Sequence, residues 1–458
     1  MTRKAFARSV RHSLLGSAAL ILASFSTVQA DFVGHGGMVR AVALSPDGQS
    51  LLTASFDYTM KRWNFQTQEE TAEFDVHEGP VNDVAFSPDG KQALSVSDDG
   101  TAILWDMATN AQLFRMTGHA HKVMSAAFSS DGKLAATGSW DRTARIWDTA
   151  TGEAIATISN TSPVNVVAFG PGDEVLFVGG HDGVIRMFSA ETGDSQGQLE
   201  GHGLGITRLS LSPDGATLLS AGIDRSIRLW DIASMREVRQ LKPHGEHIFA
   251  ADFTSDGRGI ISGDKEGQVL VTNLDTGQIS FSVNAHDAIV WDVAVSPDGR
   301  FAVSASSDES VRVWHLETGD RIGFEAEAAN RYEPWLTSDH PGAQYFTSCA
   351  KCHEVTAEGP KRSGPHFEGL FGRTVGGLEG YNYSKALREA DFVWDHETIK
   401  QLFTEGPDVM LPGTKMPVQK VPDEQALEQL VDYIAVLTGA TKPDPIEKGE
   451  APASSEAN

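Results

Sequence analysis

The stretch HEGPVNDVAFSPDGKQALSVSDDGTAILWD, residues 77–106, holds two short apolar runs on either side of a Ser-Pro-Asp-Gly turn. The runs Val81–Phe86 and Lys91–Ser95 have the length and composition of β-strands, and Pro-Asp-Gly suits the hairpin between them. The stretch therefore predicts a β-hairpin, and it serves as a template for the rest of the chain.

The same turn recurs at a spacing of 42 residues, and once of 41. Its copies are Ser45-Pro46-Asp47-Gly48, Ser87-Pro88-Asp89-Gly90, Ser129-Ser130-Asp131-Gly132, Gly170-Pro171-Gly172-Asp173, Ser212-Pro213-Asp214-Gly215, Thr254-Ser255-Asp256-Gly257 and Ser296-Pro297-Asp298-Gly299. Repeats of this length indicate one structural unit each. Seven units of about four strands predict a closed all-β ring, a seven-bladed β-propeller over residues 31–326.

Three further columns keep this period. Acids occupy Asp57, Asp99, Asp141, Asp182, Asp224, Glu266 and Asp308; six residues later come Trp63, Trp105, Trp147, Phe188, Trp230, Thr272 and Trp314; 22 residues before the acids come His35, His77, His119, Asn160, His202, His244 and His286. With Trp-Asp at Trp105-Asp106, Trp147-Asp148 and Trp230-Asp231, the pattern resembles the WD40 family over roughly residues 32–326.

The resemblance implies a buried Trp–Asp–Ser–His hydrogen-bond chain in each blade, with Ser55, Ser97, Ser139 and Ser306 as the serines. Such chains satisfy polar groups that are costly to bury. A metal or catalytic role is disfavoured, because the histidines and acids lie one per blade. Blades four and six depart from the pattern. Residues 31–33 offer little for the outer strand of the seventh blade, so Arg321–Ala326 is the expected closing strand.

The first thirty residues resemble a secretory signal. Residues 1–12 carry Arg3, Lys4, Arg8 and Arg11 without an acid, residues 14–25 are apolar, and Ala30 precedes the expected cut. A bacterial periplasmic location is the expectation, with no membrane span after cleavage. The formal net charge of −25 disfavours nucleic acid as a partner. The polar tail 441–458 is expected to be disordered.

Both cysteines of the chain lie in Cys349-Ala350-Lys351-Cys352-His353. Two thiols three residues apart can add to the two vinyl groups of one haem, and the adjacent imidazole then reaches the iron. A redox dithiol or a local disulfide are the alternatives for the motif taken alone. Two cysteines are too few for a disulfide-rich scaffold or for a four-cysteine zinc or iron–sulfur site.

Residues 341–440, after an expected linker at 327–340, resemble an all-α class I cytochrome c domain. The matching features are helices at Pro341–Cys352 and Asp423–Leu437, Gly364-Pro365, Gly369-Leu370-Phe371-Gly372-Arg373, Tyr381-Asn382-Tyr383, Trp394 and Pro412-Gly413-Thr414-Lys415-Met416. The resemblance implies one covalent haem c, held through its iron and two thioethers.

The resemblance also implies a role for each matching residue. Cys349 and Cys352 would carry the thioethers, His353 and Met416 would bind the iron, and the carbonyl of Pro365 would accept the second N–H of His353. Met410 competes with Met416. The residues expected at the haem propionates are Arg373, Tyr383, Trp394 and Thr414. Leu402 stands where the family often has a tyrosine near the distal sulfur, which puts a hydrogen bond to Met416 in doubt.

Together these features predict a one-electron carrier with unidentified redox partner proteins, because an iron with both axial positions filled has no open site for substrate. The propeller would be a platform that docks a partner. An oxidoreductase with a catalytic propeller is the rival, and a haem-based redox sensor is a third interpretation. The propeller sequence shows no second C-x-x-C-H motif and no nucleotide-binding glycine motif, so the carrier interpretation is preferred.

Overall fold

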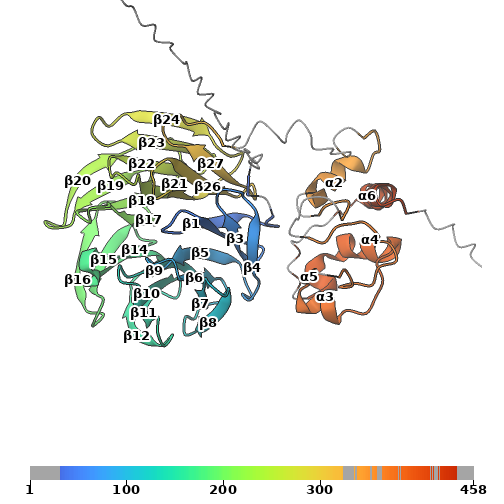
Figure 1. Ribbon diagram of the computed structural model, residues 1–458, viewed down its shortest axis with the longest axis horizontal. Coiled ribbons are helices and arrows are strands. Elements are labelled where there is room, and N and C mark those ends of the chain that lie inside the picture. Colours follow the sequence, from blue (N-terminus) through green and yellow to red (C-terminus); the bar gives the residue numbers. More distant parts are fainter. Residues whose placement is uncertain are drawn as a thin grey trace, which may run out of the picture.

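The computed structural model describes residues 31–32, 34–322, 335, 338–350, 353–357, 364–379, 381, 383–412, 414, 416, 421 and 423–440. The expected signal segment 1–30, Cys352 and the expected tail 441–458 lie outside these residues. Figure 1 shows a ring of strands formed by the first part of the chain and a helical domain formed by the last part. Among the described residues, no helix is long and apolar enough to cross a membrane.

The ring consists of seven antiparallel sheets, each built from strands consecutive in sequence. The first three sheets are β1 Val39–Leu44, β2 Ser50–Ser55, β3 Met60–Asn64 and β4 Glu70–Phe74; β5 Val81–Phe86, β6 Gln92–Ser97, β7 Ala102–Asp106 and β8 Ala111–Met116; and β9 Val123–Phe128, β10 Leu134–Ser139, β11 Thr143–Asp148 and β12 Ala154–Ser159.

The remaining four sheets follow the same order around the ring. They are β13 Val164–Phe169, β14 Val175–Gly180, β15 Val184–Ser189 and β16 Ser195–Glu200; β17 Ile206–Leu211, β18 Thr217–Gly222, β19 Ile227–Asp231 and β20 Arg236–Leu241; β21 Ile248–Phe253, β22 Gly259–Asp264, β23 Gln268–Asn273 and β24 Ile279–Asn284; and β25 Val290–Val295, β26 Phe301–Ser306 and β27 Val311–His315. A short 3-10 turn, η1 Pro171–Asp173, replaces the hairpin turn of blade 4. This arrangement confirms the predicted seven-bladed propeller.

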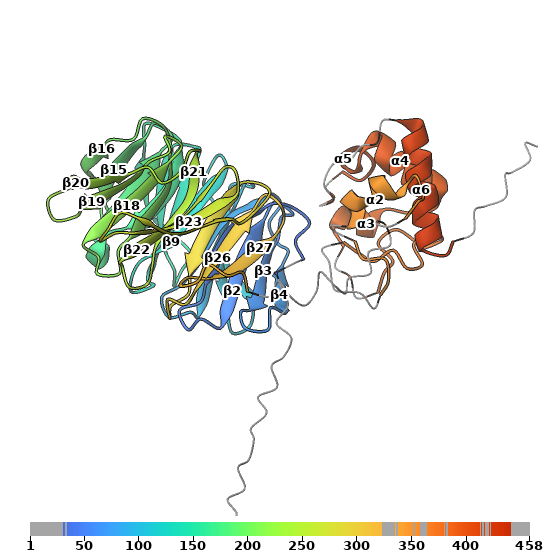
Figure 2. The same ribbon diagram turned by 90° about the horizontal axis from the view of Figure 1, so that it is seen from above.

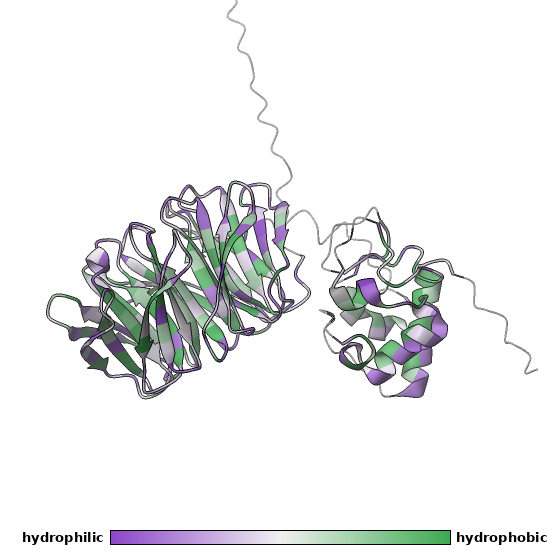
Figure 3. Cartoon of the chain, turned by 90° about the horizontal axis from the view of Figure 1, so that it is seen from below, coloured by the Kyte–Doolittle hydropathy of each residue, from purple (hydrophilic) through white to green (hydrophobic). Residues whose placement is uncertain are grey.

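The repeated turn forms for local reasons that its residues supply. In blade 2, the Asp89 carboxylate accepts the Ser87 hydroxyl at 2.8 Å and the Lys91 backbone N–H at 3.0 Å. Gly90 has a φ of 70°, a left-handed conformation that a glycine adopts without steric cost. The first strand of each blade faces the central channel (Figure 1). Apolar clusters between neighbouring blades form the core. Figure 2 shows the blades from the side, and Figure 3 shows hydrophobic residues along their strands.

A hydrogen-bond chain links four side chains inside blades 1, 2, 3, 5 and 7. In blade 2, the Trp105 indole N–H donates to the Ser95 hydroxyl at 2.9 Å. Nε2 of His77 lies 2.8 Å from that hydroxyl, and its Nδ1 lies 3.0 Å from the Asp99 carboxylate. The indole can only donate and the carboxylate only accept. The imidazole therefore bridges the hydroxyl and the carboxylate, with Nδ1 donating to the carboxylate.

The sequence analysis chose the wrong serines for the bridging hydroxyl, because the correct residues lie two positions earlier in the strand. The bridging hydroxyl lies four residues before the acid, and it belongs to Thr53, Ser95, Thr137, Ser220 and Ser304 in the five complete chains. The predicted serines instead bond a loop carbonyl and the acid's own N–H, as Ser97 does with Gly79 and Asp99. Side chains two residues apart in a strand share one face, so both hydroxyls point toward the same loop.

Blades 4 and 6 lack the complete hydrogen-bond chain of four side chains, as predicted. In blade 6 the acid is Asp264, 2.9 Å from His244, and not the predicted Glu266. Blade 4 keeps only the acid of the pattern: Asn160 and Phe188 stand in place of the histidine and the tryptophan, and Val178 takes the hydroxyl position. Its Asp182 pairs with Arg186 at 2.7 Å. The Asn160 side-chain amide donates to the Ser162 carbonyl at 2.8 Å, while its buried Oδ1 has no hydrogen-bond partner among the described residues.

Both ends of the propeller close the seventh blade. Arg321 pairs with Trp314 of β27, as the expected closing strand would, while residues 323–326 lie outside the described ones. Phe32 pairs with Val311 of the same strand and is buried, so the N-terminal residues contribute more than predicted. The Asp292 carboxylate of blade 7 also accepts the Val42 N–H of blade 1 at 3.0 Å. Backbone pairing outside and a carboxylate inside therefore join the first blade to the last.

The helical domain contains α2 Ala343–Ala350, α3 Lys385–Glu389, α4 His396–Glu405, α5 Pro407–Met410 and α6 Glu424–Leu437. Asp423 caps α6 by accepting the Ala426 N–H at 2.6 Å, as predicted. Helices α2 and α6 cross closely, because a Cβ on Gly342 would lie 1.9 Å from the Gln429 carbonyl oxygen. Trp335, in the expected linker, is 7% exposed and packs on Phe346, so it belongs to this core.

Removing the bridging hydroxyl of blade 2 tests the chain. Ser95→Ala leaves the Trp105 N–H and His77 Nε2 buried without their partner, so we expect a loss of about 1–3 kcal/mol in the free energy of unfolding. Urea titration followed by tryptophan fluorescence measures it. Ser282→Ala, on an exposed position of β24, is the control and should change stability by less than about 0.5 kcal/mol. Equal effects of the two variants would contradict this assignment.

The same hydrogen-bond chains predict that the folded propeller loses stability at acid pH. Burial lowers the pKa of His119, His202 and His286 below the ordinary 6.5, although their aspartates oppose the shift. Below pH 6.5 the unfolded chain therefore binds more protons than the folded chain. The stability that these histidines contribute is present above that pH and is lost as the pH falls. Burial would raise the pKa of Asp141, but hydrogen bonds from Thr143, Ala120 and His119 lower it to about 2, which adds a loss between pH 3.8 and about 2.

Unfolding free energies at about pH 8 and about pH 5.5 test the histidine part. His119→Asn, which copies Asn160 of blade 4, serves as the control because it removes one titrating group. We expect the wild-type protein to lose more stability on acidification than the variant. An equal loss in both proteins would show that His119 does not contribute.

Candidate functional site

Helix α2 positions Cys349 and His353, the first cysteine and the histidine of the Cys-x-x-Cys-His motif. Cys349 lies in its last turn and is 5% exposed. His353 continues the turn, because its N–H donates to the Cys349 carbonyl at 2.9 Å. The second cysteine, Cys352, lies outside the described residues. One thiol and one imidazole thus face the same side of the domain from a single helix end.

The His353 ring is held in one orientation. Its Nδ1 lies 2.7 Å from the Pro365 carbonyl oxygen, which can only accept, so Nδ1 carries the proton and the lone pair of the neutral ring lies on Nε2. The ring stacks on Phe367 with a centroid distance of 4.7 Å. Gly364 permits this contact, since a Cβ there would lie 2.4 Å from His353 Cε1. Nε2 is therefore the atom prepared to bind a metal.

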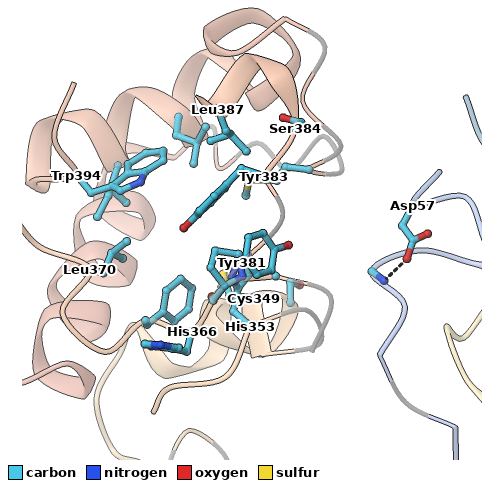
Figure 4. A pocket seen from close by; sticks show the side chains of 18 of the residues that line it. Asp57, Cys349, His353, His366, Leu370, Tyr381, Tyr383, Ser384, Leu387 and Trp394 are labelled. Atoms are coloured by element: carbon cyan, nitrogen blue, oxygen red, sulfur yellow. Dashed lines mark hydrogen bonds between the residues drawn. The ribbon is translucent and has the colours of Figure 1, made fainter. Parts of the chain in front are cut away.

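A cavity that is open to solvent lies beside this imidazole. From the helical domain its lining comprises Ser348, Cys349, His353, Gly364, Pro365, His366, Phe367, Leu370, Tyr381, Tyr383, Ser384, Leu387, Trp394, Ile399, Leu402, Phe403, Met416 and Ile434. Figure 4 shows the rings of Tyr383 and Trp394 and the side chains of Leu370 and Leu387 around this space.

Met416 also lines the cavity, although it lies 63 residues along the chain from His353. Its N–H donates to the Thr414 hydroxyl at 3.3 Å, which orders the turn before it. Met410 ends α5 and is absent from the cavity lining, so the geometry favours Met416 over its competitor. Leu402, at the position where a tyrosine was considered, lines the cavity and brings no hydroxyl to Met416.

Two of the predicted propionate residues lie apart from the cavity lining. Arg373 directs its guanidinium to the carbonyls of His366 and Glu368, at 2.9 and 3.0 Å, so it holds its own loop together. Thr414 contacts the backbone of Met416. Tyr383 and Trp394 do line the cavity, and the Tyr383 hydroxyl accepts the Leu378 N–H at 3.4 Å.

The sequence reasoning missed several apolar lining residues. Ile399 and Phe403 share one buried face of α4 with the previously considered Leu402, Phe367 comes from a loop, and Leu387 belongs to α3. Their helical spacing of three and four residues signalled a buried face, but not which cavity that face would reach. The donor set is therefore a thiol, an imidazole and a thioether around an apolar space, which fits a covalently attached haem.

Comparison with known proteins agrees with both halves. A family model described as "IFT122 first beta-propeller" matches residues 17–269, more than half of the chain, and "WD domain, G-beta repeat" matches residues 277–315. A third model, "Cytochrome c", matches residues 340–438. The chain belongs to the WD-repeat propellers and carries a cytochrome c domain.

The cytochrome c domain is similar to curated relatives over nearly its full length. Cytochrome c of Kluyveromyces lactis is 37% identical over 98 residues, which are 21% of this chain and 88% of the relative. Cytochrome c2 of Blastochloris viridis is 37% identical over 93 residues, which are 20% of this chain and 72% of the relative. A single domain of this family implies one covalent haem c with its iron, and electron transfer as the chemistry of the chain.

Gly364→Ala tests the close contact at the imidazole. A Cβ 2.4 Å from His353 forces the ring or its loop to move, so we expect about 1–3 kcal/mol lower stability of the haem domain and an altered absorption spectrum. Thermal unfolding followed in the main haem band measures both. Gly245→Ala is the control, because nothing lies within 4 Å of a Cβ there. An unchanged spectrum and melting temperature in Gly364→Ala would contradict the proposed packing.

Proposed function

We propose that this protein is an exported, periplasmic one-electron carrier whose haem iron lies between His353 and Met416. Cys349 and Cys352 hold the haem through thioether bonds. The observation that carries the proposal is that both candidate axial ligands line one cavity, with the His353 ring fixed by the Pro365 carbonyl. The haem, when bound, supplies an iron that cycles between two oxidation states.

The protein side chains define what this iron can do. Nε2 of His353 and the sulfur of Met416 would occupy both axial positions, which favours electron transfer over chemistry on a bound substrate. The hydrogen bond from Nδ1 to Pro365 orients the imidazole and leaves the lone pair of the neutral ring on Nε2, toward the cavity. Phe367, Ile399 and Phe403 exclude water from the cavity walls. An apolar pocket of this kind limits the reorganisation that accompanies a change of charge on the iron.

The smaller roles follow from the contacts. Tyr383 and Trp394 are positioned to approach the haem propionates, because both line the cavity. Arg373 acts indirectly on the haem site, because it binds the carbonyls of the loop that follows Pro365. Thr414 orders the backbone of Met416. Arg373 and Thr414 are therefore positioning residues in this proposal.

The sequence supports export and partner binding. A basic, apolar and small-residue order occupies residues 1–30, and covalent haem attachment requires both cysteines as reduced thiols before maturation. The propeller would bind a redox partner protein and bring it within reach of the haem. Its rigid ring, closed through Asp292 and Phe32, suits a docking platform.

Replacing each methionine separately tests the ligation. We expect Met416→Ala to abolish the weak far-red band that a sulfur–iron bond gives the oxidised protein, and to let the reduced protein bind carbon monoxide. Met410→Ala, outside the cavity lining, should keep the band and remain unreactive. Absorption spectra of the oxidised and reduced proteins show which methionine binds the iron. Retention of the band in Met416→Ala would refute the proposed axial ligand and move an enzyme or sensor ahead.

A further inference from the structure

One residue in each blade is left out of the pairing between the first and second strands. The register skips it near the start of the first strand, at the end away from the Ser-Pro-Asp-Gly turn, so a β-bulge forms there. The lining of the central channel begins one or two residues further along each first strand, so the bulge residues surround one mouth of the channel. They are Arg40, Asn82, Met124, Asn165, Thr207, Phe249 and Trp291.

Three of these bulge side chains bind the neighbouring blade. Asn82 and Asn165 donate through their amides, and Thr207 through its hydroxyl, to a carbonyl at the start of the next first strand, at 2.9, 2.9 and 2.8 Å. Bonds of this kind satisfy polar groups close to the channel and join successive blades. These three bulges therefore serve the ring itself.

The bulge residues of blades 6, 7 and 1 form a stack instead. The Phe249 and Trp291 rings meet edge to face with centroids 4.7 Å apart, and the Arg40 guanidinium lies 3.9 Å from the centroid of the Trp291 ring. The Trp291 N–H donates to the Ser307 hydroxyl at 2.6 Å, which fixes the indole. A guanidinium that lies over an aromatic ring presents its planar fork of N–H groups at its edge, where a carboxylate can bind with two parallel hydrogen bonds.

The Arg40 guanidinium is half-buried and has no hydrogen-bond or ion-pair partner among the residues that the structure describes. The two acids whose charges act on it are already bound: Asp83 accepts two backbone N–H groups at 2.9 Å, and Asp98 accepts the Lys122 ammonium at 2.5 Å and a neighbouring amide at 2.8 Å. Burial and the nearby Arg208 lower the pKa of Arg40 to about 10, so it stays charged at neutral pH. An unpaired cation that is partly removed from water is costly, and a carboxylate from outside relieves that cost.

Large apolar side chains surround this mouth of the channel. They come from the bulges and from loops whose backbone meets the start of the first strands, as the Phe56 N–H does when it donates to the Met38 carbonyl at 2.9 Å. Aromatic residues, Met and Arg are the residues enriched at protein interfaces. The half-buried or exposed apolar residues here are Met38, Phe56, Met124, Trp140, Ile223, Phe249 and Trp291.

The same face reaches the haem cavity at blade 1. Gly36, Asp57 and Thr59 belong to the two blade 1 loops on this face, and they line the cavity that also contains His353. Figure 4 shows Asp57 across the space from the haem-domain side chains. A protein that binds at Arg40 therefore lies beside the domain that carries the electron.

We propose that Arg40 and the Phe249–Trp291 stack bind the redox partner protein through one aspartate or glutamate side chain with apolar neighbours. The carboxylate takes the free N–H groups of Arg40, and the apolar neighbours cover the two aromatic rings. This inference rests on the docking role proposed above for the propeller and names the chemistry that the partner presents. It does not depend on which residue is the distal iron ligand.

A random peptide library displayed on phage, selected on the immobilised haem-loaded full chain, tests the site. We expect the retained peptides to share an acid beside apolar residues. A synthetic copy of the tightest one should bind Arg40→Gln at least about tenfold more weakly than the wild type. Arg225→Gln is the matched control, because Arg225 lies in a blade 5 loop on the same face and already donates to the Gly245 carbonyl at 2.9 Å. Its affinity should equal that of the wild type.

Changing the peptide makes the test independent of how the variants fold. Replacing the acid of the peptide by its amide should weaken binding to the wild type by a similar factor and leave binding to Arg40→Gln unchanged. Arg40→Lys should lie between the two, because lysine keeps the charge but not the planar pair of N–H groups.

The inference is refuted if the retained peptides share no acid, or if they bind Arg40→Gln as tightly as the wild type. In the second case the propeller docks proteins at another site, and its proposed docking role survives. If no peptide is retained, both the inference and the docking role fail. Absorption spectra of the same samples report the ligation by His353 and Met416 separately.

Discussion

The hydrogen bond between the Pro365 carbonyl and His353 is the constraint on which the chemistry of this chain depends. It assigns the proton of the ring to one nitrogen and turns the other toward the cavity. Gly364 is part of the same constraint, because any side chain at that position would meet the imidazole. The rest of the haem domain keeps these atoms in place: α2 presents the histidine, α6 packs closely against α2 through Gly342, and α4 forms the apolar wall.

The propeller uses a similar device for a different purpose. Six of its blades bury a histidine between a hydroxyl and a carboxylate, and there the ring joins a loop to a sheet. In both domains hydrogen bonds fix the orientation of a histidine ring. The second nitrogen of each of these propeller histidines bonds a hydroxyl, whereas His353 has the cavity beside it, which distinguishes a ligand from a structural residue.

Much of this architecture could be predicted from the sequence, because a period of 42 residues and a five-residue cysteine motif are strong signals. The errors share one cause. Periodicity does not separate two similar residues that lie two positions apart, so Ser97 was taken for Ser95 and Glu266 for Asp264. Trp335 was assigned to a linker because a single aromatic residue does not reveal the core it enters. The cavity faces of Ile399 and Phe403 depended on how three helices pack, which no local pattern specifies.

The composite outer strand of blade 7 has a consequence for how the two domains can be separated. Phe32 and Arg321 both pair with β27, and the chain continues from Arg321 toward the haem domain, so one of the two residues that close the ring also begins the connection between the domains. Truncating the chain directly after β27 would remove Arg321, one of the two residues that pair with this strand, together with the cytochrome c domain. The propeller therefore extends to Ile322. A force that acts on the connection to the haem domain reaches blade 7, where the ring closes, before it reaches any other blade.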